Sequence, residues 1–144
     1  MNEYQKLRDR QQQEFNALPL GFAFSDKQFR EMMQGWGLDP EKDTDKIFSI
    51  GYGGFVQKKD ADLLHTTTAR HEAELSAAIA GDQTGDGFIC DMFRTELDNH
   101  EYSYTMDLSD TLDALGYTAA AINADKRLLH GLERACAAIL EASA

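Results

Sequence analysis

The chain has 144 residues, of which 42% are hydrophobic and 27% charged, and two cysteines. This size and composition are typical of one globular domain and argue against wholesale disorder. No apolar run approaches the roughly 18 residues of a membrane span, and the polar start of the chain, Met1-Asn2-Glu3-Tyr4, is unlike a secretory signal. We therefore expect a single soluble, cytoplasmic domain over residues 1–144 that makes no contact with membranes.

Charge is the most informative bulk property of the chain. The sequence holds 25 acidic and 14 basic residues, for a formal net charge of −11. Residues 82–113 contain nine of the acidic residues and one basic residue, Arg94, so this segment alone has a net charge of −8. Such a segment disfavours direct binding to nucleic-acid phosphates and favours attraction to a basic partner.

The amino-terminal part of the chain predicts two helices. Residues 2–17 have a modest apolar stripe at helical spacing and end before a proline. Residues 21–24 are expected to be extended. Ser25 and Gln28 then have the spacing of a helix capping box, so a second helix is expected from Ser25 to about Trp36.

The middle of the chain predicts a hairpin followed by two longer helices. Residues 46–58 contain two short apolar runs joined by glycines, a pattern typical of a β-hairpin. Residues 60–80 and 88–99 are expected to be helical. Residues 101–105 are predicted to be a short strand or a loop.

The carboxy-terminal part contains the strongest helical pattern. A short helix is expected at residues 109–115, Thr118 is a candidate cap for a short helical turn, and residues 125–142 carry a long apolar stripe. Together these elements predict an α+β, mainly α fold: a compact bundle of about five helices with one short antiparallel β-hairpin.

The segment Asp82-Gln83-Thr84-Gly85-Asp86-Gly87-Phe88-Ile89 resembles the first eight positions of a calcium-binding EF-hand loop. Its candidate ligands are Asp82, Thr84 and Asp86. The twelfth position, which should be an acid, is Phe93. The other interpretation is a turn in which aspartate and glycine satisfy the ends of two helices. We expect no metal or cofactor, and keep calcium at these three residues as the alternative.

No group of residues predicts catalysis. Cys136 lies on the apolar stripe of the last helix, and Cys90 is next to Asp91, whose negative charge disfavours a thiolate. His65 and His71 are six residues apart, unlike the i, i+4 pair of a zinc protease. We therefore assign no catalytic residue and expect a non-enzymatic protein. A metal-binding regulatory domain and a small hydrolase of unknown substrate are the alternatives.

Five segments, spread over nearly the whole chain, carry a family resemblance: Phe15–Ser25, Asp45–Gly51, Gly85–Phe93, Asn99–Tyr102 and Asp125–Gly131. On these segments the chain resembles a family of small acidic proteins of unknown function from gut Clostridia and related bacteria, associated with phages and other mobile elements. The resemblance implies no catalytic motif. It implies a context in which small acidic proteins include inhibitors of host defence, such as anti-CRISPR proteins that block nucleic-acid-guided nucleases.

These observations lead to one functional expectation, an acidic surface that engages a basic nucleic-acid-processing protein, for example a defence nuclease. Such a surface occupies the groove that the partner uses for DNA or RNA. Within the predicted helix 88–99, Asp91, Thr95 and Asp98 form a polar stripe at i, i+4 and i+7. The candidate partner-binding residues are Asp91, Asp98, Glu101, Asp107, Asp110 and Asp113. The oligomeric state is left open.

Overall fold

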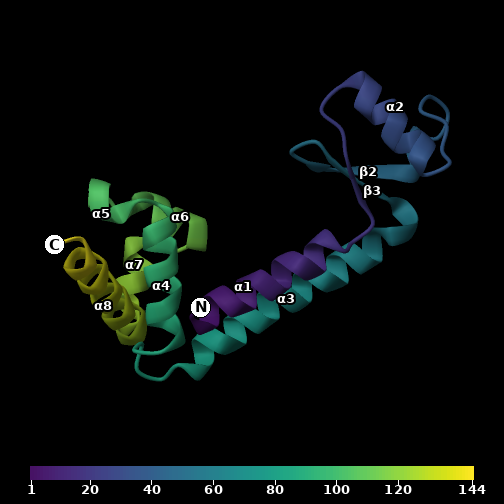
Figure 1. Ribbon diagram of the computed structural model, residues 1–144. Helices are drawn as coiled ribbons and strands as arrows, with labels where there is room; N and C mark the ends of the chain where they lie inside the picture. Colours follow the sequence, from purple (N-terminus) through teal and green to yellow (C-terminus); the bar gives the residue numbers. More distant parts are fainter. The chain divides into compact units, whose positions relative to one another are not determined.

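A computed structural model describes residues 1–144, which form eight α-helices and one three-stranded antiparallel sheet (Figure 1). The chain divides into two compact units. We call them the helical unit, Met1–Gln12 with Ala73–Ala144, and the sheet unit, Gln13–Glu72. Helices α1 (Glu3–Asn16) and α3 (Ala61–Gly81) contribute residues to both. The expectation of a single domain stays a prediction.

The sheet unit contains the expected hairpin and one further strand. Strands β2 (Ile47–Gly51) and β3 (Gly54–Gln57) form the hairpin. Strand β1 (Leu20–Phe22) pairs with the other side of β3, so the strand order is β1-β3-β2. The expectation of a lone hairpin was therefore wrong. The apolar, extended segment after the first helix completes the sheet because strand pairing satisfies its backbone groups.

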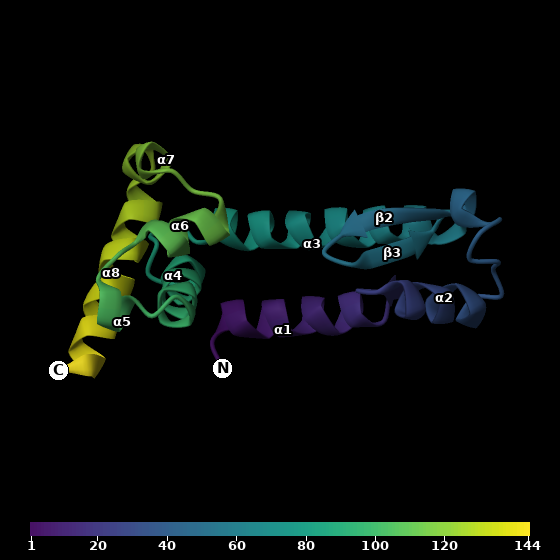
Figure 2. The same cartoon turned by 90° about the horizontal axis from the view of Figure 1, so that it is seen from above.

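Helix α2 (Asp26–Gly35) covers one face of this sheet, and Figure 2 shows it beside the strands. Gly21 and Phe55 are opposite each other in the register and face α2. The rings of Phe29 and Phe55 meet edge to face with their centroids 5.4 Å apart. A methyl group added at Gly21 would lie 2.5 Å from Sδ of Met32, so a larger residue there would require the Met32 side chain to move.

The amino-terminal cap of α2 gives a prediction for the sheet unit. The Ser25 hydroxyl accepts a hydrogen bond from the backbone N–H of Gln28 at 3.2 Å, as the capping-box spacing predicts. Ser25→Ala should lower the free energy of unfolding by about 1 kcal/mol, because this N–H loses its partner. Urea unfolding followed by the fluorescence of Trp36, the single tryptophan, measures the loss within this unit.

Thr66→Ala is the matched control for this measurement. Thr66 lies in the same unit, is exposed in the interior of α3 and caps no helix end, so its substitution also removes one hydroxyl group. We expect the control to leave the transition in place or raise it slightly, since alanine has the higher helix propensity. An equal loss in both variants would contradict the capping role of Ser25.

The helical unit is built on the packing of α4 (Phe88–Asn99) against α8 (Lys126–Ser143), which Figure 1 shows crossing each other. Their facing apolar stripes, both predicted from the sequence, supply most of the buried core: Ile89, Met92, Phe93, Leu97, Leu128, Leu132, Ala135 and Ile139. The two helices come close at Gly131, where an added methyl group would lie 2.5 Å from Cγ2 of Ile89.

Three short helices complete this unit: α5 (Tyr102–Thr105), α6 (Ser109–Leu115) and α7 (Ala119–Ala124). Thr118 caps α7, as expected, because its hydroxyl accepts from the N–H of Ala121. The helix count of about five was too low. The expectation of a strand or loop at residues 101–105 was wrong, since these residues form a single helical turn. Left-handed residues bound that turn, Glu101 at φ 57° and Met106 at φ 53°, and neither is a glycine or asparagine that would mark it in the sequence.

Candidate protein-binding surface

Asp82, the first residue of the acidic segment 82–113, lies in the turn between α3 and α4. Both oxygens of Asp82 accept backbone hydrogen bonds, Oδ1 from Thr84 and Gly85 at 3.2 and 2.9 Å, and Oδ2 from Gly87 and Ile89 at 3.0 Å each. Burial raises the pKa of the Asp82 carboxyl, but these four N–H donors outweigh it and hold the pKa below the ordinary value. Asp82 therefore caps the start of α4, which confirms the interpretation of this segment as an interhelical turn.

The other two candidate calcium ligands also have partners within the chain. Thr84 Oγ1 accepts from the N–H of Asp86 at 3.1 Å. The Asp86 carboxylate lies 2.7 Å from Nε2 of His130 and 3.2 Å from Nη1 of Arg134, both on α8. Phe93, at the twelfth position of the motif, is fully buried in the core. Calcium binding at these residues stays a hypothesis.

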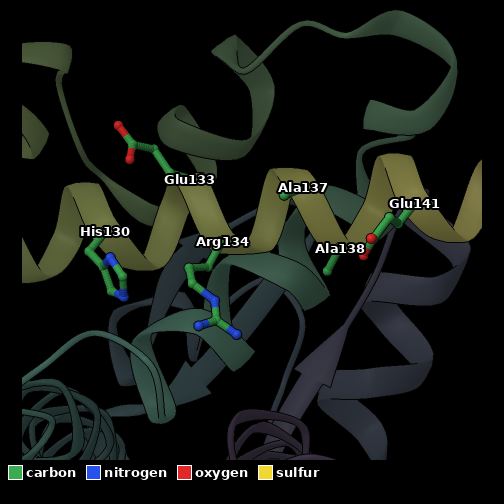
Figure 3. Close-up of a pocket in the computed structure, with 6 residues that line it drawn as sticks. All are labelled: His130, Glu133, Arg134, Ala137, Ala138 and Glu141. Atoms are coloured by element: carbon green, nitrogen blue, oxygen red, sulfur yellow. The ribbon is translucent and has the colours of Figure 1, made fainter.

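His130 and Arg134 also line a shallow hollow on α8, of about 360 Å³ (Figure 3). Their side chains extend from the same side of the helix, whereas Glu133 extends from the other side. His130 is exposed, and its Nε2 forms a hydrogen bond with the Asp86 carboxylate. Both side chains thus contact the same carboxylate, that of Asp86.

The predicted polar stripe of α4 lies along an open cleft. Its volume is about 400 Å³, and its lining comes from the start of the chain, α4 and α8: Asn2, Gln5, Asp91, Arg94, Thr95, Asp98, Ile139 and Ala142. Nδ2 of Asn2 donates to Oγ1 of Thr95 at 3.0 Å, which fixes the start of the chain against the middle of the stripe. The structure therefore brings Asp91 and Asp98 to one cleft, with Arg94 beside them.

The remaining four candidate acids lie on the segments that follow α4. Glu101 precedes α5, Asp107 lies between α5 and α6, and Asp110 and Asp113 are on α6. Helix α4 packs against both α5 and α6. The Thr111 hydroxyl, fully buried, donates to the carbonyl of Glu96 at 3.4 Å and fixes α6 to α4.

The six carboxylates share one property, the absence of an ion-pair partner in the chain. Five of them are exposed and Asp91 is half-buried. None forms a salt bridge within 4.0 Å; some acids elsewhere in the chain do, for example Asp86 and Asp125, and others, such as Glu31 and Asp62, do not. The six differ from those others in that they lie close together in the sequence, in and after α4. We call these six residues, Asp91, Asp98, Glu101, Asp107, Asp110 and Asp113, the acidic surface.

Two features of this region could not be anticipated from the sequence. The start of the chain forms one wall of the acidic cleft, through Asn2 and Gln5. Glu96, an acid of the same segment, is not part of the acidic surface. Its Oε1 accepts a hydrogen bond from the buried hydroxyl of Tyr4 at 3.0 Å. Burial is the main reason that the pKa of Tyr4 is raised. No local signal marks either contact, since the partners are about 90 residues apart.

The thiols lie where the sequence predicts unreactive groups. Cys90 and Cys136 are both free and partly buried. Burial raises the pKa of both thiols, and the charge of Asp91 raises that of Cys90 further. Both are therefore protonated at neutral pH, which disfavours nucleophilic attack.

The fold and this surface define a mainly helical α+β protein that presents unpaired carboxylates. A family model described as a family of unknown function (DUF7659) matches residues 3–138. The chain belongs to this family, which confirms the resemblance to a family of unknown function. No curated protein and no solved structure matches the chain. None of its helices is both long enough and apolar enough to cross a bilayer.

Proposed function

We propose that this protein binds a basic nucleic-acid-processing protein through its acidic surface. The observation that carries the proposal is that six carboxylates in and after α4 have no ion-pair partner in the chain. The charge is unevenly divided, since the helical unit has 15 acidic and 7 basic residues and the sheet unit 10 and 7. Carboxylates without an ion-pair partner produce a negative potential around the helical unit.

A negative surface of this kind suits a partner whose own surface binds phosphates. Lysine and arginine side chains that line a DNA or RNA groove meet carboxylates as readily as phosphate oxygens. Such complementarity mainly accelerates association and fixes the partner, and it weakens as salt screens the charges. The cleft beside Asp91 and Asp98 gives room for side chains of the partner, with Ile139 and Ala142 as an apolar wall.

The most concrete form of the proposal is an inhibitor of a defence nuclease, of the anti-CRISPR type. Such an inhibitor would be encoded by a phage or another mobile element and would act in the cytoplasm of a gut bacterium. Purified nuclease from such a host, loaded with its guide, tests this form directly. Addition of the protein should slow cleavage of target DNA at low ionic strength, and less so at high ionic strength.

The prediction for the acidic surface uses a triple neutralisation. Asp91→Asn, Asp98→Asn and Glu101→Gln together should weaken binding to the partner about tenfold, since each surface charge contributes roughly 0.5 kcal/mol. The slope of affinity against salt concentration should also flatten. Capture from host lysate at low and high salt, with mass spectrometry, identifies the partner, and calorimetry on the purified pair then measures the affinity.

The matched control removes the same charge from the sheet unit. Glu31, Asp62 and Glu72 are exposed there, so Glu31→Gln, Asp62→Asn and Glu72→Gln change the net charge equally. We expect this control to bind with nearly the affinity of the unchanged protein. If both triple variants weaken binding to the same extent, net charge rather than the acidic surface is responsible, and the proposal is wrong.

A further inference from the structure

The sheet unit exposes large apolar side chains that the acidic surface does not involve. Phe22, Phe24, Phe48, Ile50 and Tyr52 are 54, 75, 47, 37 and 99% exposed. Scattered apolar residues are ordinary on protein surfaces, but a contiguous patch of aromatic rings marks an interaction site. We call these five residues the hairpin surface.

The five side chains gather around the turn of the β2–β3 hairpin. Phe22 is opposite Gly54 in the register. A methyl group at Gly54 would lie 2.8 Å from Cγ1 of Ile50, and one at Gly53 would lie 2.4 Å from the ring of Phe24. The glycines of the turn therefore leave space that the neighbouring apolar side chains fill, and the outer sides of those side chains stay in solvent.

The same region has an unpaired strand edge. Strand β2 pairs with β3 only, so no strand pairs with its other edge. All residues of β2 after Ile47 are exposed. Residues 47–56 contain no charged side chain, although the chain as a whole carries a net charge of −11. Of the usual protections of an edge strand, this segment lacks a charged side chain and a proline, but its pairing with β3 is irregular between Ser49 and Gly51.

The exposed area of the hairpin surface favours a second copy of the chain as its binding partner. An aromatic side chain offers roughly 150–250 Å², so the exposed fractions of the four rings amount to about 550 Å² per copy. Two copies that buried these rings completely would bury about 1,100 Å², near the lower limit of about 1,200 Å² for specific interfaces. The same surface on both copies can form an interface with two-fold symmetry.

Charge supports the same binding partner. Residues 47–56 carry no charged side chain, so two copies that meet at this segment bring none of its charges into contact, and a basic protein would find no carboxylate there. The nearby ammonium of Lys58 lies 5.1 Å from the centroid of the Phe48 ring, at one border of the hairpin surface.

We propose that two copies of this chain associate through the hairpin surface. We expect a weak dimer, with a dissociation constant on the order of 10 μM. Sedimentation velocity of the full chain, from about 1 to 200 μM and with reductant present, should show a rise from monomer to dimer mass. The rise should persist at high salt, because apolar burial does not depend on charge attraction.

Two variants test the surface, and a third is the control. Tyr52→Asn removes the most exposed ring and keeps the fold, because Asn-Gly is the favoured pair where both turn residues have positive φ, here 51° and 76°. It should raise the dissociation constant at least tenfold. Ile50→Lys should abolish the dimer, with fluorescence of Trp36 as the check on folding. Tyr104→Asn removes a tyrosine of the helical unit that is 87% exposed and should leave the dimer unchanged.

Three results would overturn the proposal. The first is a monomer at every concentration, including the case in which the monomer floats with phosphatidylcholine vesicles and so uses the surface for lipid. The second is a dimer that Tyr52→Asn and Ile50→Lys leave intact. The third is a dimer that dissolves in high salt, which would assign association to charged groups and leave the proposal for the acidic surface untouched.

Discussion

Replacing Gly85 with alanine is expected to destabilise the protein by about 3–5 kcal/mol, the largest effect of any single methyl group in the chain. Gly85 has φ +90°, and an added Cβ would lie 2.2 Å from the backbone oxygen of Arg127. The conformation is strained for any other residue, and the neighbouring atom belongs to the backbone of α8, which cannot move aside cheaply. Urea unfolding followed by circular dichroism at 222 nm measures the loss.

Gly116→Ala separates the effect of the positive φ from the effect of the close contact with α8. Gly116 has a similar φ, +75°, but no atom lies within 4 Å of the position of its Cβ. Its substitution should cost only the strain of a left-handed alanine, about 1 kcal/mol. Equal losses at Gly85 and Gly116 would show that the contact with α8 is looser than the structure describes.

Asp82→Ala is the second large effect, an expected loss of about 2 kcal/mol in the free energy of unfolding. Four backbone N–H groups lose their acceptor at once, including those of Gly87 and Ile89 at the start of α4. Asp82→Asn keeps one acceptor oxygen and should lose about half as much. Chemical denaturation at pH 7 compares the three proteins.

The pH dependence of this contribution has a definite sign. The pKa of Asp82 is lowered below its ordinary 3.8, so the folded state binds the proton less readily than the unfolded state. The stabilisation is therefore fully present above about pH 4 and is lost as the pH falls through the lowered native pKa. The difference in stability between the unchanged protein and Asp82→Asn should be constant from pH 7 to pH 5 and shrink below pH 4. A difference that grew on acidification would refute the role of the ionised carboxylate.

The sequence predicted those parts of the fold that short-range interactions determine. Ser25 and Thr118 act as caps because their hydroxyls meet N–H groups three residues later, and the helical stripes of α4 and α8 follow from spacing alone. The pairing of β1 with β3 joins residues more than thirty positions apart, and nothing near Leu20 specifies Val56 as its partner. The third strand was missed for that reason.

The candidate surface was predictable to a similar degree. That Asp98, Asp110 and Asp113 are exposed follows from their places on amphipathic helices, and the structure agrees. That they lack ion-pair partners does not follow, because pairing depends on which cations the tertiary fold brings near. Asp86 illustrates the difference, since its partners His130 and Arg134 come from a helix more than forty residues later.

The position of the chain ends along the acidic cleft decides how the protein should be handled in any binding assay. Asn2 and Ala142 line that cleft, so a tag fused to either end would stand beside Asp91 and Asp98. A positively charged or bulky tag would screen the carboxylates and imitate a loss of function. Five of the seven lysines lie in the sheet unit: Lys27, Lys42, Lys46, Lys58 and Lys59. Attachment of the untagged protein to a surface through its amines would therefore leave the acidic surface free on most molecules.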